Sequence, residues 1–255
     1  MPDFLTTADN EKIAYAKSDG DGPTLIWCGG LKSDMEGSKA THLHAWAKVR
    51  GQAFIRFDYF GHGQSSGEFI EGTMSRWAAD IKIIRDELCD GPVILIGSSM
   101  GGWAALLAAI ANTPRVAGLV LINPAPDFTE KLTVAGWTED QIKALEHDGV
   151  VYEPSGYDEP YAYSKALIED GRDRQILDLP IPLTCPIRIL QGYEDPVVPW
   201  AHSKRLIDML TSKDVTYTLV AGGDHSLSRA SDLKLIENAI ADITNTSIAT
   251  ANSTK

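Results

Sequence analysis

The stretch that most constrains the fold is residues 94–109, ILIGSSMGGWAALLAA. Aliphatic residues lead directly into Gly97-Ser98-Ser99-Met100-Gly101, and a run of good helix formers follows. Gly-x-Ser-x-Gly between a strand and a helix is typical of a nucleophile elbow, a turn so tight that side chains at the flanking positions would clash. A glycine-rich turn that cradles phosphate is the alternative. The pattern predicts that Ser99 is a nucleophile held at the end of a buried strand.

Strand-like and helix-like segments alternate along most of the chain. Continuous rather than alternating apolarity predicts strands that are buried on both faces, as in a parallel sheet. Helical spacing of apolar residues separates these strands, which indicates an α/β fold with a mostly parallel sheet flanked by helices. Residues 3–7 and 12–18 read as a hairpin, and so as antiparallel edge strands. The buried strands are expected at residues 24–27, 53–57, 93–96, 116–122 and 187–190.

The alternation is interrupted between Asn123 and Pro186, after the sixth predicted strand. This region holds helical patterns at residues 138–146 and 161–169 and four tyrosines, but no convincing central strand. An insertion at this point would lie above the carboxyl ends of the strands, where open α/β sheets place their sites. We therefore expect a core of residues 1–124 and 186–245, a small helical cap of residues 125–185, and a disordered tail of residues 246–255.

Two residues downstream of the elbow could activate Ser99. A serine hydroxyl needs a base, and the base needs a third group to orient it. Asp195 follows the strand at residues 187–190, and His225 follows the strand at residues 215–220. Because all three residues follow strand ends, they can converge at one edge of a parallel sheet in the chain order Ser, acid, His. Asp127 is an alternative acid, because it follows the strand at residues 116–122.

Backbone amides near Ser99 could bind a developing oxyanion. The Met100 N–H lies at the start of the helix after the elbow, and a second donor should come from the loop after the strand at residues 24–27. In that loop we expect the Gly30 N–H, with Leu31 as an alternative. Cys28 is expected to be packed in the core. Asp58, in FDYFGHGQSSG, is expected to pin its loop through hydrogen bonds.

The composition limits the partners that the protein is expected to bind and the compartment in which it is expected to work. The chain has 35 acidic and 23 basic residues and a net charge of −12, so we expect no binding to nucleic acid. No apolar stretch reaches about 18 residues, so no integral membrane association is expected. Three distant cysteines without a CxxC or Cys/His cluster indicate a reduced compartment and no metal site. Because no signal peptide is evident, the location predicted is cytoplasmic.

Four stretches carry a resemblance to known proteins: GLKSDMEGSKA, IRFDYFGHGQSSG, DGPVILIGSSMGGW and CPIRILQGYEDPVVPW. Over nearly its whole length the chain resembles the α/β-hydrolase superfamily. More narrowly, it resembles the abhydrolase domain-containing protein ten family, mitochondrial palmitoyl-protein thioesterases that also cleave acyl glucuronides. The resemblance implies Ser99, Asp195 and His225 as a catalytic triad beneath a small cap. Two departures are Cys28, where many superfamily members have histidine, and a start without the presequence of the animal members.

The predicted function is hydrolysis of a carboxylic ester or thioester through an acyl-enzyme on Ser99, with no metal or other cofactor. The substrate is expected to be a small ester or an acylated peptide or protein. Leu31, Trp103 and Trp137 are expected to contact it, with the alternative that the tryptophans only pack the cap on the core. A short-chain carboxylesterase, a perhydrolase using the same triad, and a low-turnover ligand-binding protein are the alternative functions.

Overall fold

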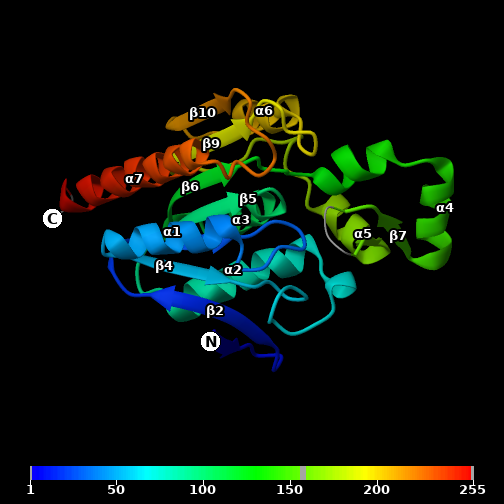
Figure 1. Ribbon diagram of the computed structural model, residues 1–255, viewed down its shortest axis with the longest axis horizontal. Helices are drawn as coiled ribbons and strands as arrows, with labels where there is room; N and C mark the ends of the chain where they lie inside the picture. Colours follow the sequence, from blue (N-terminus) through cyan, green and yellow to red (C-terminus); the bar gives the residue numbers. More distant parts are fainter. Residues whose placement is uncertain (1, 156–158, 254–255) are drawn as a thin grey trace.

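A mostly parallel eight-stranded sheet forms the centre of the computed structural model, which describes residues 2–155 and 159–253 (Figure 1). The strand order is β1-β2-β4-β3-β5-β6-β9-β10, and only β1 and β2 at one edge run antiparallel to their neighbours. This confirms the predicted α/β fold with its antiparallel edge. The strands are β1 (Asp3–Thr6), β2 (Lys12–Ser18), β3 (Asp21–Cys28), β4 (Gln52–Phe57), β5 (Val93–Ser98), β6 (Val116–Ile122), β9 (Ile187–Gly192) and β10 (Val215–Val220).

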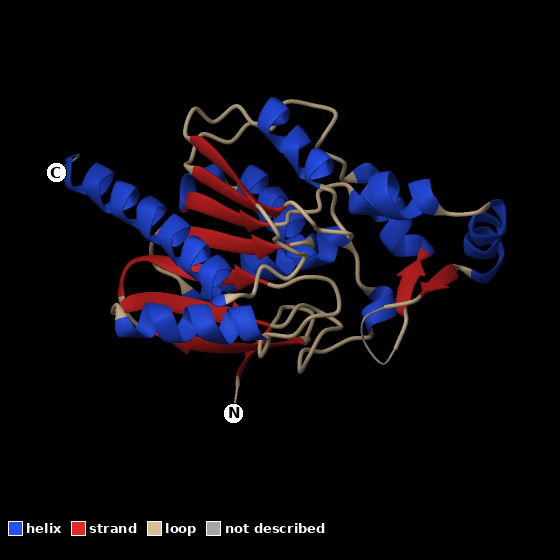
Figure 2. Ribbon diagram, turned by 45° about the horizontal axis from the view of Figure 1, so that its top comes forward, coloured by secondary structure: helices blue, strands red, loops and turns tan. Residues whose placement is uncertain are grey.

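Helices cover both faces of the sheet, as Figure 2 shows. Successive residues of a strand point to opposite faces, so β5 contributes Leu95 to one apolar cluster and Ile94 and Ile96 to the other. This two-sided burial explains why the central strands are continuously apolar. The first face is covered by α2 (Met74–Leu88), α3 (Met100–Ala111) and α6 (Trp200–Met209), and the second by α1 (Ser38–Val49) and α7 (Ala230–Ser253).

The insertion between β6 and β9 forms a cap at the carboxyl ends of the strands (Figure 1). It contains a small two-stranded antiparallel sheet as well as helices, so the expectation of a small helical cap without a convincing strand was wrong in part. Its elements are η3 (Thr129–Thr133), η4 (Val134–Gly136), α4 (Glu139–Asp148), β7 (Val150–Glu153), β8 (Tyr161–Ser164) and α5 (Lys165–Asp173).

The local sequence explains why the helix expected over residues 161–169 begins later. Tyr161 and Tyr163 are aromatic residues that favour a strand, and they pair with β7. The Ser164 hydroxyl then accepts the Leu167 N–H at 3.1 Å and caps α5. Ser164, in the middle of the stretch expected to be helical, therefore marks the N-terminus of the helix, which begins at Lys165.

The last helix, α7, continues to Ser253. The expectation of a disordered tail from Thr246 is therefore wrong for residues 246–253. Residues 254–255 lie outside the described residues. The hydroxyls of Thr244, Thr246 and Ser247 donate to carbonyls four residues earlier, at 2.9–3.0 Å. Small polar residues thus satisfy their hydroxyls within the helix instead of ending it.

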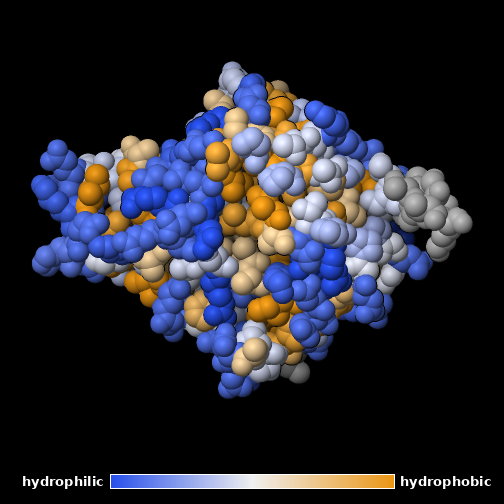
Figure 3. All heavy atoms as spheres, turned by 180° about the vertical axis from the view of Figure 1, so that it is seen from behind, coloured by the Kyte–Doolittle hydropathy of each residue, from blue (hydrophilic) through white to orange (hydrophobic). Residues whose placement is uncertain are grey.

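The surface of the cap end is largely hydrophilic in Figure 3, where it lies on the left, whereas hydrophobic residues gather nearer the middle of this face. None of the helices in the described ranges combines the length and the apolar character needed to cross a bilayer. Charged residues of α4 contribute to the hydrophilic end: Glu139, Asp140, Lys143, Glu146 and Asp148.

Candidate active site

The turn between β5 and α3 holds Ser99 in a strained conformation. Its φ of 54° lies in the left-handed region that non-glycine residues rarely adopt. A Cβ atom on Gly97 would lie 2.6 Å from the Gly101 carbonyl oxygen, and one on Gly101 would overlap the carbonyls of residues 28 and 29. Backbone packing therefore demands glycine at both positions, as the sequence pattern predicted.

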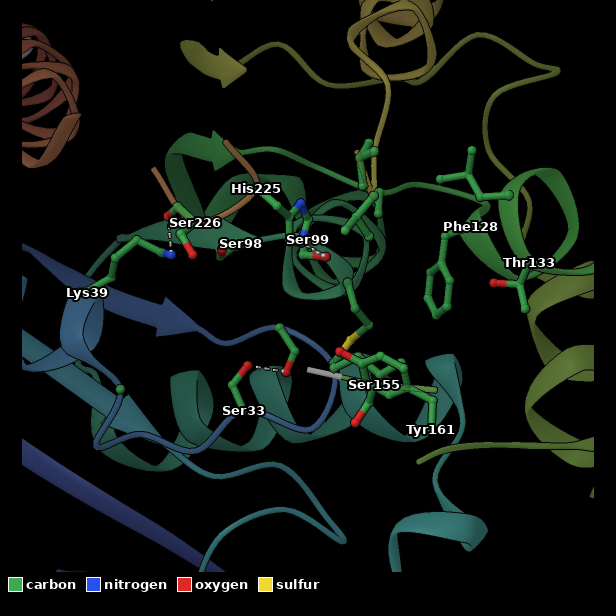
Figure 4. A pocket seen from close by; sticks show the side chains of 18 of the residues that line it. Ser33, Lys39, Ser98, Ser99, Phe128, Thr133, Ser155, Tyr161, His225 and Ser226 are labelled. Atoms are coloured by element: carbon green, nitrogen blue, oxygen red, sulfur yellow. Dashed lines mark hydrogen bonds between the residues drawn. The ribbon is translucent and has the colours of Figure 1, made fainter. Parts of the chain in front are cut away.

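The structure brings Ser99, His225 and Asp195 together in one line of hydrogen bonds. The Ser99 Oγ lies 3.2 Å from His225 Nε2, and His225 Nδ1 lies 2.8 Å from Asp195 Oδ2 (Figure 4 shows the Ser99–His225 pair). The Asp195 side chain is fully buried, whereas 29% of the His225 side chain is exposed. A serine in this arrangement can pass its proton to a histidine whose orientation is held by a carboxylate.

Asp195 is fixed by backbone amides of its own loop. The N–H groups of Val197 and Val198 donate to its Oδ1 at 2.8 and 2.9 Å. Gln191, at the end of β9, places its amide Nε2 3.4 Å from Oδ2 and donates to the Val198 carbonyl at 3.0 Å. Gln191 was missed from the sequence, where a single polar residue in a buried strand was the only signal.

The alternative acid, Asp127, is engaged elsewhere. It is fully buried, and its two oxygens accept the backbone N–H groups of Ile176 and Leu177 at 2.8 and 2.9 Å. This carboxylate joins the loop after β6 to the segment after α5. The carboxylate that accepts a hydrogen bond from His225 Nδ1 is that of Asp195.

Asn123 joins the loops that carry the acid and the histidine. Its side-chain amide donates to the carbonyls of Asp224 and His225 at 3.1 and 2.7 Å, and its Oδ1 accepts the Gly192 N–H at 2.7 Å. Asn123 is fully buried and has a φ of 43°, which asparagine tolerates better than most residues. It follows β6 directly, and its position at a strand end was the only sequence signal.

Two backbone segments meet beside Ser99. Met100 is the first residue of α3, where main-chain N–H groups have no partner within the helix. Gly30 lies against the serine, since a Cβ on Gly30 would be 3.5 Å from the Ser99 Cβ. The Gly30 loop is braced because Ser33 N–H donates to its carbonyl at 3.1 Å and Lys32 N–H donates to His62 Nε2 at 3.1 Å.

His62 and Asp58 hold the neighbouring loop. Burial lowers the pKa of His62 to about 4, so the ring is neutral near pH 7, and its Nδ1 lies 3.1 Å from the Phe60 carbonyl. Asp58 accepts the N–H groups of Met35 and Gln64 at 2.6 and 2.8 Å, which confirms its predicted role as a loop pin.

Cys28, at the end of β3, is fully buried, and burial raises the pKa of its thiol to about 12. It is therefore a packing residue without thiolate character, as expected. In the described ranges, no group of three or more His, Cys, Asp and Glu side chains is arranged to hold a metal ion.

A cavity of about 650 Å³ opens over Ser99 between the core and the cap. Leu31 lines it, and its contact with substrate stays a prediction. Trp103 and Trp137 are not among its described lining residues, so the expectation that they contact the substrate was wrong. Both lie one layer behind: Trp103 packs edge-on against Phe128, and Trp137 donates to Glu153 Oε1 at 2.6 Å. Both were expected at the cavity because large aromatics near an elbow or in a cap suggest a lining, but these two pack in the layer that supports it.

Comparison with known proteins shows the family of this chain and its relatives. Residues 29–243 match the model of the alpha/beta hydrolase family. The human protein named palmitoyl-protein thioesterase ABHD10, mitochondrial, is 38% identical over 242 residues, which cover 94% of this chain and 79% of that protein. The mouse protein of the same name is 37% identical over 246 residues, covering 94% of this chain and 81% of that protein.

Solved structures agree with this relationship. The mouse alpha/beta hydrolase domain-containing protein 10 superposes with a TM-score of 0.89 at 34% identity, covering 96% of this chain and 99% of that one. A protein from Agrobacterium vitis S4 superposes with a TM-score of 0.91 at 39% identity, covering 96% of this chain and 98% of that one. The names of the human and mouse relatives place them in mitochondria, so a cytoplasmic location for this chain stays a prediction.

Proposed function

The chain belongs to the alpha/beta hydrolase family and is a hydrolase of ester or thioester bonds, and we propose that it works through a triad of Ser99, His225 and Asp195. The observation that carries this proposal is the unbroken pair of hydrogen bonds from Ser99 Oγ through the His225 ring to the Asp195 carboxylate. No other described His or Asp contacts the serine hydroxyl.

In the proposed mechanism, Ser99 Oγ attacks the acyl carbonyl carbon while His225 Nε2 takes the hydroxyl proton. The bond to the leaving sulfur or oxygen then breaks, and His225 protonates that atom. Asp195 holds the ring through Nδ1 and stabilises the imidazolium. Water, deprotonated by His225, attacks the acyl-serine, and the carboxylic acid leaves as Ser99 regains its proton.

The negative charge that develops on the carbonyl oxygen is assigned to the Met100 and Gly30 N–H groups. Support comes from the position of Met100 at the first turn of α3 and from the close approach of Gly30 to Ser99. The helix dipole of α3 adds positive potential at the same point. The Leu31 N–H is the alternative second donor in this loop.

We assign the acyl chain to the apolar end of the cavity beneath the cap. The apolar residues that line the cavity include Leu31, Met100, Phe128, Leu132, Val197 and Val198, and Figure 4 shows Phe128 on the side away from Lys39. An acylated cysteine of a peptide or protein is the preferred substrate, because the human and mouse relatives, of which the match covers 79% and 81%, are named palmitoyl-protein thioesterases. Small acyl esters, including acyl glucuronides, are the alternative oxyester class.

The test begins with labelling by a fluorophosphonate probe, followed by assays of p-nitrophenyl esters of graded chain length and of a palmitoyl-cysteine peptide. Labelling and turnover should be lost in Ser99→Ala. They should persist in Ser18→Ala, whose hydroxyl, in β2, has no hydrogen-bond partner within the described residues. Dependence on chain length then separates a long-chain thioesterase from a short-chain esterase.

Other outcomes would support other functions. Wild-type protein that binds a fatty acyl ligand stoichiometrically but is neither labelled nor active would be a binding protein that kept the fold. Bromination of a halogenation dye with hydrogen peroxide and a short carboxylic acid, lost in Ser99→Ala, would indicate a perhydrolase with the same triad.

A further inference from the structure

The cavity over Ser99 has a second, polar end. Figure 4 shows Lys39 and Ser226 on one side of the Ser99–His225 pair, with Phe128, Thr133 and Tyr161 on the other. The polar end is formed by the loop after β3, the start of α1 and the loop after β10. From these three segments, the polar residues that line the cavity are Ser33, Asp34, Ser38, Lys39, Ser226 and Ser228.

Lys39 is the cation of this end. Its Nζ donates to the Ser226 carbonyl, and its side chain is partly buried. Among the residues that the structure describes, no carboxylate lies within 4.0 Å of this ammonium group. Burial lowers the pKa of Lys39, and the Asp224 carboxylate, which is farther away, partly offsets this effect. A partly desolvated ammonium without an ion pair gains stability from an incoming anion.

The start of α1 adds positive potential at the same place. Gly37 occupies the N-cap position without a side-chain cap, and the first turn contains no acidic residue. The helix dipole therefore favours an anion there and acts in the same direction as the Lys39 charge. Asp34 is the carboxylate that lines this end, and it is exposed to solvent.

The position of His225 decides which part of a substrate reaches Lys39. The leaving group must contact His225 Nε2 to receive its proton. Ser226 follows His225 directly, and its carbonyl holds Lys39. With the acyl chain at the apolar end, the leaving group extends past His225 into the polar end.

We propose that Lys39 is a specificity-determining residue that binds a carboxylate on the leaving group of the substrate. Among thiol and alcohol leaving groups, one that carries a carboxylate near its sulfur or oxygen atom is then cleaved faster. In an acylated peptide, this carboxylate is the C-terminus of a chain that ends in the acylated cysteine, or an acidic side chain next to that cysteine. This inference rests on the proposed serine-hydrolase function and names the substrate class for the same site.

The test compares two octanoyl thioesters that differ in one charge: that of N-acetylcysteine, and that of the primary amide of N-acetylcysteine. The wild-type protein should show a higher kcat/KM for the carboxylate. Lys39→Met should lower the carboxylate-to-amide ratio of kcat/KM by about tenfold, because a charge-assisted hydrogen bond is lost. Lys39→Arg should retain most of the ratio.

Lys48→Met is the matched control, because Lys48 is an exposed lysine in the last turn of the same helix. It should leave the ratio unchanged. Circular dichroism and thermal unfolding of each variant establish that it is folded.

Each contrary result has a distinct meaning. An equal loss on both thioesters in Lys39→Met would show that Lys39 only supports the His225 loop, and an unchanged ratio would show that it does not meet the leaving group. Wild-type protein that is labelled at Ser99 but cleaves neither thioester would also overturn the inference while retaining the serine nucleophile. Absence of labelling and of all ester turnover would instead overturn the proposed function.

Discussion

Asp195 is a buried carboxylate with hydrogen-bond partners on both of its oxygens. Two main-chain N–H groups hold Oδ1, and His225 and the Gln191 amide contact Oδ2. These hydrogen bonds leave the carboxylate little freedom to rotate. The His225 ring is thereby held with Nε2 directed at Ser99.

Replacing Asp195 with Asn tests this arrangement. The side-chain amide of Asn has the same shape as the carboxylate, but its NH₂ group cannot accept a hydrogen bond. Where this group faces His225 Nδ1, it favours the tautomer with the proton on Nε2, which cannot take the proton of Ser99. We expect kcat for a p-nitrophenyl ester to fall by about 10³- to 10⁴-fold, by analogy with other serine triads. Asp127→Asn is the comparison, since it should chiefly lower thermal stability by weakening the bonds to Ile176 and Leu177. A large loss of kcat in folded Asp127→Asn, with little change in Asp195→Asn, would contradict the assignment.

At the scale of elements, the site depends on loops that follow β5, β6, β9 and β10. Asn123 joins three of these loops through its hydrogen bonds to residues 192, 224 and 225. The asparagine therefore sets the distance between the acid and the histidine without touching the reacting atoms.

Asn123→Ala should leave the Gly192 N–H and two carbonyls without their partner. We expect a loss of about 2–4 kcal/mol in the free energy of unfolding, measured by urea denaturation, and a lower kcat in the folded enzyme. Asn112→Ala, at the end of α3, is the control and should change both quantities little. A folded Asn123→Ala enzyme with wild-type kcat would show that the loops keep their spacing without this side chain.

The elements differ in how far the sequence predicts them. The central strands are predictable because burial on both faces makes them continuously apolar, and the glycines at 97 and 101 mark the elbow because no side chain fits there. The short cap strands depend on pairing between residues 150–153 and 161–164, which local periodicity does not contain. Gln191 and Asn123 are single polar residues whose roles appear only when distant loops meet. The positions of Trp103 and Trp137 depend in the same way on the packing of cap against core.

At the scale of the whole molecule, two buried titratable groups respond to acid in opposite directions. Burial lowers the pKa of His62 from 6.5 to about 4 and raises the pKa of Asp80 from 3.8 to about 6. Both groups contact the backbone of Phe60. The His62 ring lies within hydrogen-bond distance of the Phe60 carbonyl, and the Asp80 carboxylate accepts the Phe60 N–H at 2.8 Å. Their effects on stability therefore arise in one small region.

As pH falls from 6.5 to 4, the unfolded chain protonates His62 while the folded chain does not, so this group costs up to about 3 kcal/mol of stability. As pH falls from 6 to 4, the folded chain protonates Asp80 first, so this group adds up to about 3 kcal/mol. The two contributions largely cancel in the wild-type protein.

Single variants should reveal each contribution in urea unfolding at pH 7 and at about pH 4.5. The stability advantage of wild type over His62→Gln should shrink on acidification, whereas its advantage over Asp80→Asn should grow. Differences that stay constant with pH in both variants would contradict these pKa shifts.

The order of strands in the sheet has a consequence for the chain as it is made. His225 follows β10, the last strand, which pairs at the edge of the sheet beside β9. A ribosome-bound chain from which the elbow, the cap and Asp195 have already emerged still lacks the base proposed for Ser99. Since domains are synthesised from the N-terminus onward, the proposed nucleophile Ser99 meets its proposed base only after β10 has been made and has docked beside β9. On the proposed mechanism, the enzyme becomes active only once the edge strand β10 has joined the sheet.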